Sequence, residues 1–252
     1  MANEPGVRVT TDPVHNVRAL TTNDLSSAAR VHLLAFPDSA LTLLGAEAVR
    51  RYYSWQLLGP HDVVALCITE NEELTAFCIG GTFVGALQGF LRKNQRYLCW
   101  RLVTHPWLLI RGPVSNQIGT AVRSLVKSLR AKKRSVVQIH QGTRATFGIL
   151  AIAVEPSKMG TGQGKCLMNC LEHSARLRHY SGMHLTVSPD NSRAIDFYER
   201  LGWSRYPGSD GRWMGAMKKN LSLELLESGH YPRPANTNRS RAVSTTTTTT
   251  SE

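Results

Sequence analysis

The stretch SKMGTGQGKC, residues 157–166, holds three glycines in five positions: Gly160, Gly162 and Gly164. The apolar run ILAIAV (149–154) precedes it, and CLMNCLEHSARLRHY (166–180) follows it with the pattern of an amphipathic helix. A glycine-rich turn between a strand and a helix brings main-chain N–H groups and the positive end of the helix dipole to one point. The sequence therefore predicts a turn that binds a phosphate.

Two common phosphate-binding motifs do not fit this turn. A P-loop requires GxxxxGK followed by Ser or Thr, but Gly164-Lys165 is followed by Cys166, and Met159 occupies the position of the first glycine. The dinucleotide fingerprint GxGxxG requires a glycine three residues after Gly162, where this chain has Lys165. The phosphate is therefore expected to belong to another kind of ligand.

A second motif lies downstream and has the form N-x-x-A-x-x-F-Y-x-x-x-G-W, from Asn191 through Tyr198 to Trp203. Together with V-x-P-x-x-x-G-x-G-x-G-K, from Val154 to Lys165, it resembles the GNAT superfamily of acyl-CoA-dependent N-acetyltransferases. The resemblance covers residues 145–220 well and residues 62–80 loosely. It implies an α/β fold with a mixed, mostly antiparallel central sheet of six to seven strands. It also implies splayed fourth and fifth strands and helices on both faces.

The resemblance implies acetyl-CoA as a cosubstrate and indicates which residues bind it. The glycines allow the main chain to approach the pyrophosphate, because a side chain there would block it. The implied pyrophosphate residues are Met159, Gly160, Thr161, Gly162, Gln163, Gly164 and Lys165. The main chain of Ile152, Ala153 and Val154 is expected to hydrogen-bond the pantetheine arm like an added strand.

One position departs from the family pattern. Members usually have Gln or Arg at the first position of Q/R-x-x-G-x-G/A, where this chain has Met159. Lys158 or Lys165 is the expected substitute for that polar group. The departure concerns the affinity for the cofactor more than the fold.

The resemblance also implies catalytic roles. Tyr198 is expected to protonate the departing thiolate, since a phenol with its usual pKa is protonated at pH 7. Asn191 is expected to cap a helix and, by resemblance, to bind the pantetheine arm or a water. No carboxylate lies in residues 145–154, where many relatives have a general base. The alternatives are a water chain or one of His140, His184, Glu70 and Glu72, and His32 is assigned to the core or the rim.

Apolar periodicity and turn residues predict the remaining elements. Strands are expected at 17–20, 62–69, 73–80, 135–140, 145–154, 183–188, 203–208 and 212–221, and helices at 21–36, 46–58, 120–134, 162–180 and 189–202. Residues 62–80 should form a hairpin connected by 70–72. We expect a flexible leader at 1–15, a single N-acetyltransferase domain at 16–226, and a disordered Thr-rich tail at 227–252.

The positive charge is confined to one segment of the chain. The net charge is +12, and no Asp or Glu lies between Glu73 and Glu155, where there are twelve Lys and Arg residues. This segment includes a basic insertion at about 82–134, which favours an anionic partner. The acceptor is expected to be a small-molecule amine. An amino sugar carried on an acidic nucleotide is one alternative, and a peptide, an aminoglycoside or another small amine stays open. The first alternative rests on a loose likeness of the helices near 37–58 to acetyltransferases of bacterial polysaccharide biosynthesis.

Three other functions remain open from the sequence. The chain could be a degenerate acyl-CoA binder without turnover, because Met159 is unusual and no base is evident. Residues 82–134 could instead lie on an anionic membrane, since Trp and Arg flank aliphatic residues there. Nucleic-acid binding is less favoured, because the aromatic residues do not form a stacking platform. The sequence leaves the oligomeric state open.

The composition indicates where the protein is expected in the cell and whether a metal site is expected. No apolar run of 18 residues exists and the first residues do not resemble a signal peptide, so a cytoplasmic protein is expected. Cys166 and Cys170 are one helical turn apart, but a lone pair of this kind provides too few metal ligands. No metal site is predicted, and these thiols are expected in the core.

Overall fold

A computed structural model describes residues 15–83, 85–105, 146–208 and 210–221. The predicted helix 120–134, the predicted strand 135–140 and the tail 227–252 lie outside these residues. The same is true of His140 and of the leader apart from its last residue.

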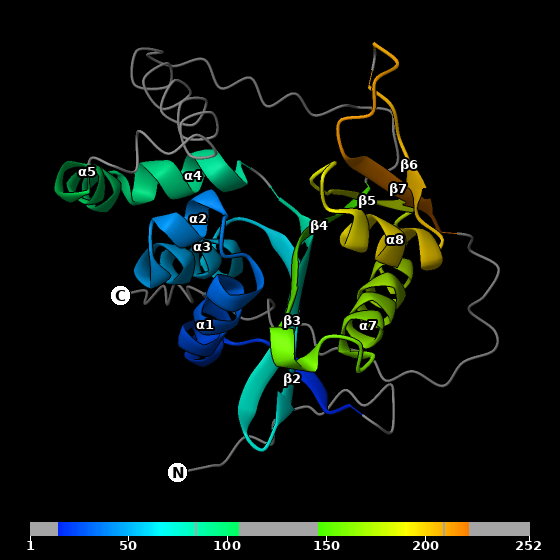
Figure 1. Ribbon diagram of the computed structural model, residues 1–252, viewed down its shortest axis with the longest axis horizontal. Helices are drawn as coiled ribbons and strands as arrows, with labels where there is room; N and C mark the ends of the chain where they lie inside the picture. The colour runs from blue at the N-terminus through cyan, green and yellow to red at the C-terminus, as the bar shows by residue number, and fades with distance from the viewer. Residues whose placement is uncertain (1–14, 84, 106–145, 209, 222–252) are drawn as a thin grey trace, which may run out of the picture.

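One sheet forms the centre of the molecule (Figure 1). Its seven strands lie in the order β1-β2-β3-β4-β5-β7-β6, and all neighbours are antiparallel except β4 and β5, which are parallel. The strands are β1 Val17–Ala19, β2 Asp62–Glu70, β3 Glu73–Thr82, β4 Phe147–Val154, β5 Gly182–Thr186, β6 Ser204–Arg205 and β7 Ala216–Asn220. The mixed, mostly antiparallel sheet that the sequence predicts is confirmed.

The splay between the fourth and fifth strands is confirmed as well. β4 pairs with β5 only at Phe147↔Met183 and Gly148↔His184. Beyond Gly148, β4 continues to Val154, and β3 is its only partner among the described strands. The two strands therefore diverge after Gly148 and leave one edge of β4 without a described strand partner.

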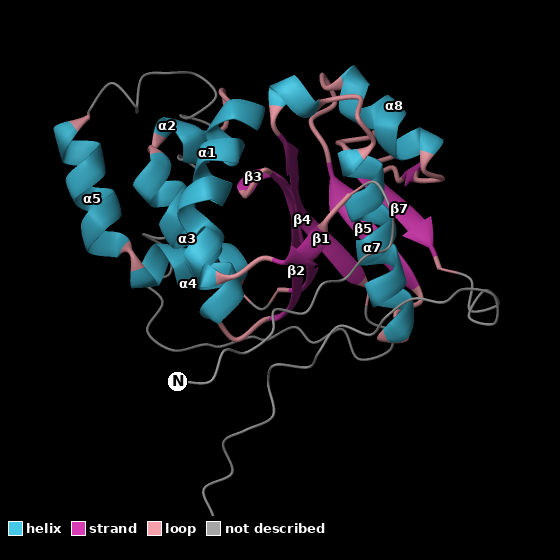
Figure 2. Cartoon of the chain, turned by 90° about the horizontal axis from the view of Figure 1, so that it is seen from below, coloured by secondary structure: helices cyan, strands magenta, loops and turns pink. Residues whose placement is uncertain are grey.

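Helices cover both faces of the sheet (Figure 2). One face carries α1 to α5, and the other carries α7 and α8. The helices are α1 Leu25–Ala35, α2 Ala40–Leu43, α3 Ala46–Leu58, α4 Ala86–Lys93, α5 Gln95–Thr104, α7 Gln163–Leu177 and α8 Ser192–Arg200. Short 3-10 turns, η1 Thr22–Asp24 and η3 Pro156–Lys158, precede α1 and the glycine turn.

Each face of the sheet has its own apolar core. Phe147, Leu167 and Met183 belong to the cluster beneath α7 and α8, whereas Tyr53 and Phe77 belong to the cluster beneath α1 and α3. β3 contributes to both clusters, and every residue from 74 to 81 is buried. This confirms that consecutive apolar residues mark a strand covered on both faces. Cys166 and Cys170 are buried in the first cluster, as expected for core thiols.

Local sequence signals set several boundaries. The helix predicted at 46–58 matches α3, which begins after Gly45 at φ 95° and ends at Gly59. The predicted hairpin connection shortens to two residues, Asn71 and Glu72, with φ of 49° and 69°. These left-handed values are typical of a tight two-residue turn that matches the twist of the strands.

Other boundaries differ from the sequence prediction. The helix predicted at 162–180 ends at Leu177, and the strands predicted at 203–208 and 212–221 shrink to β6 and β7. The sequence prediction missed α2, which has only four residues and whose N-cap is Ser39. Short elements carry too little periodicity to be recognised from sequence alone.

The described part of the basic insertion packs as two helices, α4 and α5. Phe90 and Leu98 contact Leu44 and Ala48 in a small third cluster. Arg101 is committed to this packing, because its Nε donates to the Leu44 carbonyl at 3.1 Å. The described part of the insertion is therefore part of the fold.

Candidate active site

A cleft of about 730 Å³ opens between the diverging strands β4 and β5. Its walls come from α1 and α3 on one side, from β4 at the base, and from the glycine turn, α7, β5 and α8 on the other. All the predicted site residues except Thr161 line it, although they come from three separate parts of the chain. Thr161 points elsewhere, since its hydroxyl donates to the Lys158 carbonyl at 2.7 Å.

The register of β4 determines which main-chain groups face the cleft. The Glu155 amide donates to the Thr75 carbonyl of β3 at 2.8 Å. Because main-chain groups alternate in an antiparallel ladder, Ala153 also faces β3, while Ile152 and Val154 face the opposite edge. After Gly148, no strand in the described part of the chain pairs with that edge. Ile152 and Val154 can therefore bind an extended ligand, and the Ala153 main chain is committed to the sheet.

The glycine turn offers main-chain donors at the start of α7. The first hydrogen bond of the helix joins the Cys166 amide to the Gly162 carbonyl at 2.9 Å. The preceding amides, of Gln163, Gly164 and Lys165, have no helical acceptor and lie at the positive end of the dipole. Gly160 and Gly162 have φ of 86° and 90°, a backbone that only glycine adopts easily.

A polar network anchors this turn to β2 and β3. Glu70 accepts from Lys158 Nζ at 2.5 Å and from Gln163 Nε2 at 2.6 Å. Thr75 Oγ1 donates to Gln163 Oε1 at 3.2 Å, and Gln163 is only 1% exposed. The neighbouring ammonium lowers the pKa of the Glu70 carboxyl. The Gln163 side chain thus holds the turn in place, and only its main chain is available to a ligand.

Gln163→Leu is expected to destabilise the fold by about 1–3 kcal/mol, because it removes the two hydrogen bonds by which the buried Gln163 side chain holds Glu70 and Thr75. The measurement is the midpoint of urea unfolding. Gln56→Leu is the matched control: Gln56 is 0% exposed, but its amide nitrogen makes a single long contact of 3.5 Å, and its oxygen has no partner among the described residues. Equal losses for the two variants would contradict the anchoring role of Gln163.

α8 places two of the predicted residues in the cleft. Asn191 Oδ1 accepts from the Ala194 amide at 3.0 Å, which confirms that it caps the helix. Tyr198 lies about two turns further along α8, and its ring packs between the rings of Phe197 and Trp203. Burial raises the pKa of Tyr198 to about 12, so the phenol stays protonated at neutral pH. No described residue hydrogen-bonds its hydroxyl, which leaves this donor available.

The opposite wall contains a buried histidine and a buried tyrosine. His32 and Tyr53 line the cleft, and His32 Nδ1 lies 2.7 Å from Tyr53 Oη. The sequence prediction placed His32 in the core or at the rim, and it is buried as expected. Its position in the cleft was not foreseen, because a histidine on an apolar helix face gives the same pattern in either place.

The described candidates for a general base lie outside the cleft. Glu70 is paired with Lys158, Glu72 occupies the hairpin turn, and His184 is on β5, where Gly148 is its strand partner. The described residues that line the cleft include no Asp or Glu. Its cations, which are Lys158, Lys165, Arg193 and Arg200, all come from the glycine turn, α7 and α8.

His32 should make the fold sensitive to acid. Burial lowers its pKa from 6.5 to about 4. The free energy of unfolding that neutral, buried His32 contributes is therefore complete above about pH 6.5. It is lost as the pH falls towards 4, because the histidine of the unfolded chain takes up a proton first. The loss at pH 4 should be about 3 kcal/mol. Urea unfolding at pH 7 and pH 4 should show this extra loss in the wild type relative to His32→Gln, and equal losses in both would contradict it.

In the part of the chain that the structure describes, no helix is long and apolar enough to span a membrane.

Comparison with known proteins agrees with this architecture. Residues 128–203 match the family model for the acetyltransferase (GNAT) family. No curated protein matches the sequence. Among solved structures, a protein from Desulfovibrio desulfuricans assigned to the GNAT family has a TM-score of 0.50 at 14% identity. The alignment covers 83% of this chain and all of that one, and the likeness concerns the fold.

Two further structures are similar at a lower level. The ribosomal-protein-S18-alanine N-acetyltransferase of Escherichia coli has a TM-score of 0.47 at 17% identity, over 86% of this chain and 100% of that one. The PaiA N-acetyltransferase of Thermoplasma acidophilum, solved with coenzyme A, has a TM-score of 0.48 at 11% identity, over 82% and 98%. The family match spans the glycine turn and α8, and the splayed seven-stranded sheet agrees with it, so this part of the chain is similar to the acetyltransferase (GNAT) family.

Proposed function

We propose that the chain transfers the acetyl group of acetyl-CoA to a primary amine by direct attack within a ternary complex. One observation carries the proposal: the uncovered edge of β4 leads directly to the free amides of the glycine turn, in the cleft that Tyr198 lines. Acetyl-CoA would use all three features: the free strand edge for its pantetheine arm, the helix N-terminus for its pyrophosphate, and the phenol for its departing sulfur.

The cleft suits this cofactor in both shape and chemistry. Enzymes of the family use acetyl-CoA, which supplies a thioester and a thiolate leaving group. The main chain of Ile152 and Val154 would bind the amide-containing arm, and the amides of Gln163 to Lys165 would bind the pyrophosphate. Lys165 is exposed in the first turn of α7 and would add positive charge, whereas Lys158 is already paired with Glu70. This arrangement would compensate for Met159.

The chain's own groups would assist two parts of the reaction. Tyr198 would donate its proton to the departing sulfur, since its hydroxyl is protonated and free of described partners. Asn191 uses its oxygen for the helix cap, so its NH₂ group is left to bind the pantetheine arm or a water. We infer that residues 16–226 act as one acetyltransferase domain, with 82–134 as a basic insertion.

Calorimetry with coenzyme A and a thiol-release assay with acetyl-CoA and an amine panel test the proposal together. We expect binding, and thiol release that depends on the amine. Binding without release for any amine would instead identify a degenerate acyl-CoA binder, and no binding would overturn the proposal. An amino sugar or a sugar nucleotide, suggested by the sequence, belongs in the panel.

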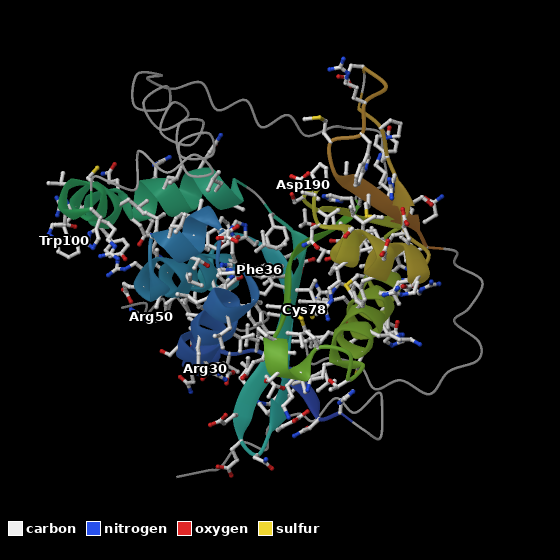
Figure 3. All side chains as sticks on the ribbon, in the orientation of Figure 1. Arg30, Phe36, Arg50, Cys78, Trp100 and Asp190 are labelled. Atoms are coloured by element: carbon white, nitrogen blue, oxygen red, sulfur yellow. The ribbon has the colours of Figure 1, made fainter. Side chains whose placement is uncertain are left out.

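A membrane contact through residues 82–134 remains a prediction. Trp100 and Val103 lie on one side of α5 and are 59% and 79% exposed, and Arg92 and Lys93 lie in the last turn of α4, the preceding helix. Figure 3 shows Trp100 at the far end of α5, away from the sheet. Sedimentation with anionic vesicles would test this contact separately from catalysis.

A further inference from the structure

The glycine turn is contacted by a residue that the sequence prediction assigned to the leader. His15 is only 8% exposed, and its Nε2 lies 3.1 Å from the carbonyl oxygen of Thr161. The antiparallel pairing of β1 with β2, continued by two residues, places His15 opposite Glu70. The pKa of the Glu70 carboxyl is lowered mainly by Lys158 and to a smaller extent by His15, which agrees with this proximity. The start of β1 is thus tied to the glycine turn, 146 residues further along the chain.

The chemistry of the two groups determines which of them donates. A carbonyl oxygen can only accept, so His15 must carry a proton on Nε2 and donate it to Thr161. The neutral imidazole that is protonated on Nδ1 alone cannot make this bond. The hydrogen bond therefore holds the Thr161 carbonyl in one orientation, towards His15.

The orientation of this carbonyl decides where the next amide points. In a trans peptide, the C=O group of one residue and the N–H group of the next lie in one plane and point in opposite directions. The Thr161 carbonyl faces His15, which is not part of the cleft wall, so the N–H group of Gly162, which lines the cleft, points away from His15. No main-chain carbonyl of the described residues accepts from this amide. It is therefore available to a ligand in the cleft.

The glycine at position 162 explains why this peptide needs to be held. Gly162 has φ of 90° and no Cβ, so its own sterics do little to prevent the peptide between residues 161 and 162 from turning over. A peptide turned over in this way would point the Thr161 carbonyl, instead of the Gly162 amide, away from His15. The negative end of the carbonyl dipole would then repel a phosphate. The His15 hydrogen bond stabilises the orientation that suits an anion.

Given the proposed acetyl-CoA site, we propose that His15 is a positioning residue for the cofactor. By holding the Thr161 carbonyl, it directs the Gly162 amide at the pyrophosphate. This amide adds to those of Gln163, Gly164 and Lys165 at the start of α7. His15 lies outside the cleft lining and acts on the cofactor only through the peptide that it holds.

Calorimetry with coenzyme A tests this role. We expect His15→Ala to weaken binding about 10-fold, the effect of losing one hydrogen bond to a charged group. His15→Gln should bind within about twofold of the wild type, because its amide keeps an N–H donor on a side chain of similar length. Arg101→Ala is the matched control, since Arg101 Nε also donates to a main-chain carbonyl, that of Leu44, at 3.1 Å outside the cleft lining. It should keep wild-type affinity even where it lowers the midpoint of urea unfolding as much as His15→Ala does.

A comparison of two acetyl donors separates positioning from general support of the fold. S-acetylpantetheine carries the same thioester as acetyl-CoA but has no pyrophosphate. With an amine that supports turnover, His15→Ala should raise KM for acetyl-CoA about 10-fold and leave kcat/KM for S-acetylpantetheine unchanged. Equal losses with both donors would overturn the inference.

Nitrogen-15 NMR tests the geometry in the wild-type protein. The His15 imidazole should be protonated on Nε2, and the Gly162 amide signal should shift when coenzyme A is added. Protonation on Nδ1 alone, an unshifted Gly162 amide, or wild-type affinity of folded His15→Ala would each overturn the role of His15 and leave the proposed function intact. Failure of the wild-type protein to bind coenzyme A would overturn both together.

Discussion

Tyr198→Phe is expected to lower kcat at least 100-fold and to leave KM for acetyl-CoA within about twofold, because general acid catalysis contributes 100-fold or more. The substitution removes only the hydroxyl, and the ring keeps its contacts with Phe197 and Trp203. Thiol release at saturating amine is the measurement. Tyr180→Phe, whose hydroxyl also makes a side-chain hydrogen bond, serves as the control and should retain wild-type kcat.

The pH dependence adds a second readout for Tyr198. Burial raises its pKa to about 12, so the acid form persists and the wild-type rate should not fall through loss of this proton up to about pH 10. Full activity of Tyr198→Phe at neutral pH would remove the phenol from the mechanism. The acetyl-CoA site would then still stand on the calorimetric result.

Gly162→Asp is expected to weaken coenzyme A binding about 100-fold, which calorimetry can measure. Gly162 is the N-cap of α7, so a carboxylate there would meet the pyrophosphate at the end of the helix that favours anions. Gly162→Asn separates charge from shape, because Asn has nearly the same size and tolerates the left-handed backbone. We expect the Asn variant to bind at least 10-fold more tightly than the Asp variant.

A control for the backbone itself comes from another turn. Gly211 has φ of 75°, and a Cβ there would have no neighbour within 4 Å, so Gly211→Asp introduces the same residue at a similar backbone conformation outside the cleft lining. This variant should bind coenzyme A like the wild type. Equal affinities of the Asp and Asn variants at position 162 would mean that no phosphate binds at the start of α7.

Much of the candidate site was accessible from sequence because it is built from main chain. The glycine turn and the strand before it are contiguous in the sequence. Their main-chain N–H groups can bind a ligand without any specific side chain, provided that glycine leaves room for the ligand to approach. Side-chain roles were less accessible. Gln163 stands in the middle of the glycine motif, yet its side chain turns inward to Glu70 and Thr75, residues far away along the chain.

By itself, the sequence determined the likeness to the acetyltransferase (GNAT) family, the central sheet and the residues of the glycine turn, because these depend on local spacing and apolar periodicity. Only the tertiary structure decided which edge of β4 is uncovered, how Glu70 is used, and that His32 and Tyr53 meet at the cleft. Those outcomes depend on strand register and on the packing of α1 against α3, and both arise from contacts between residues distant in the chain.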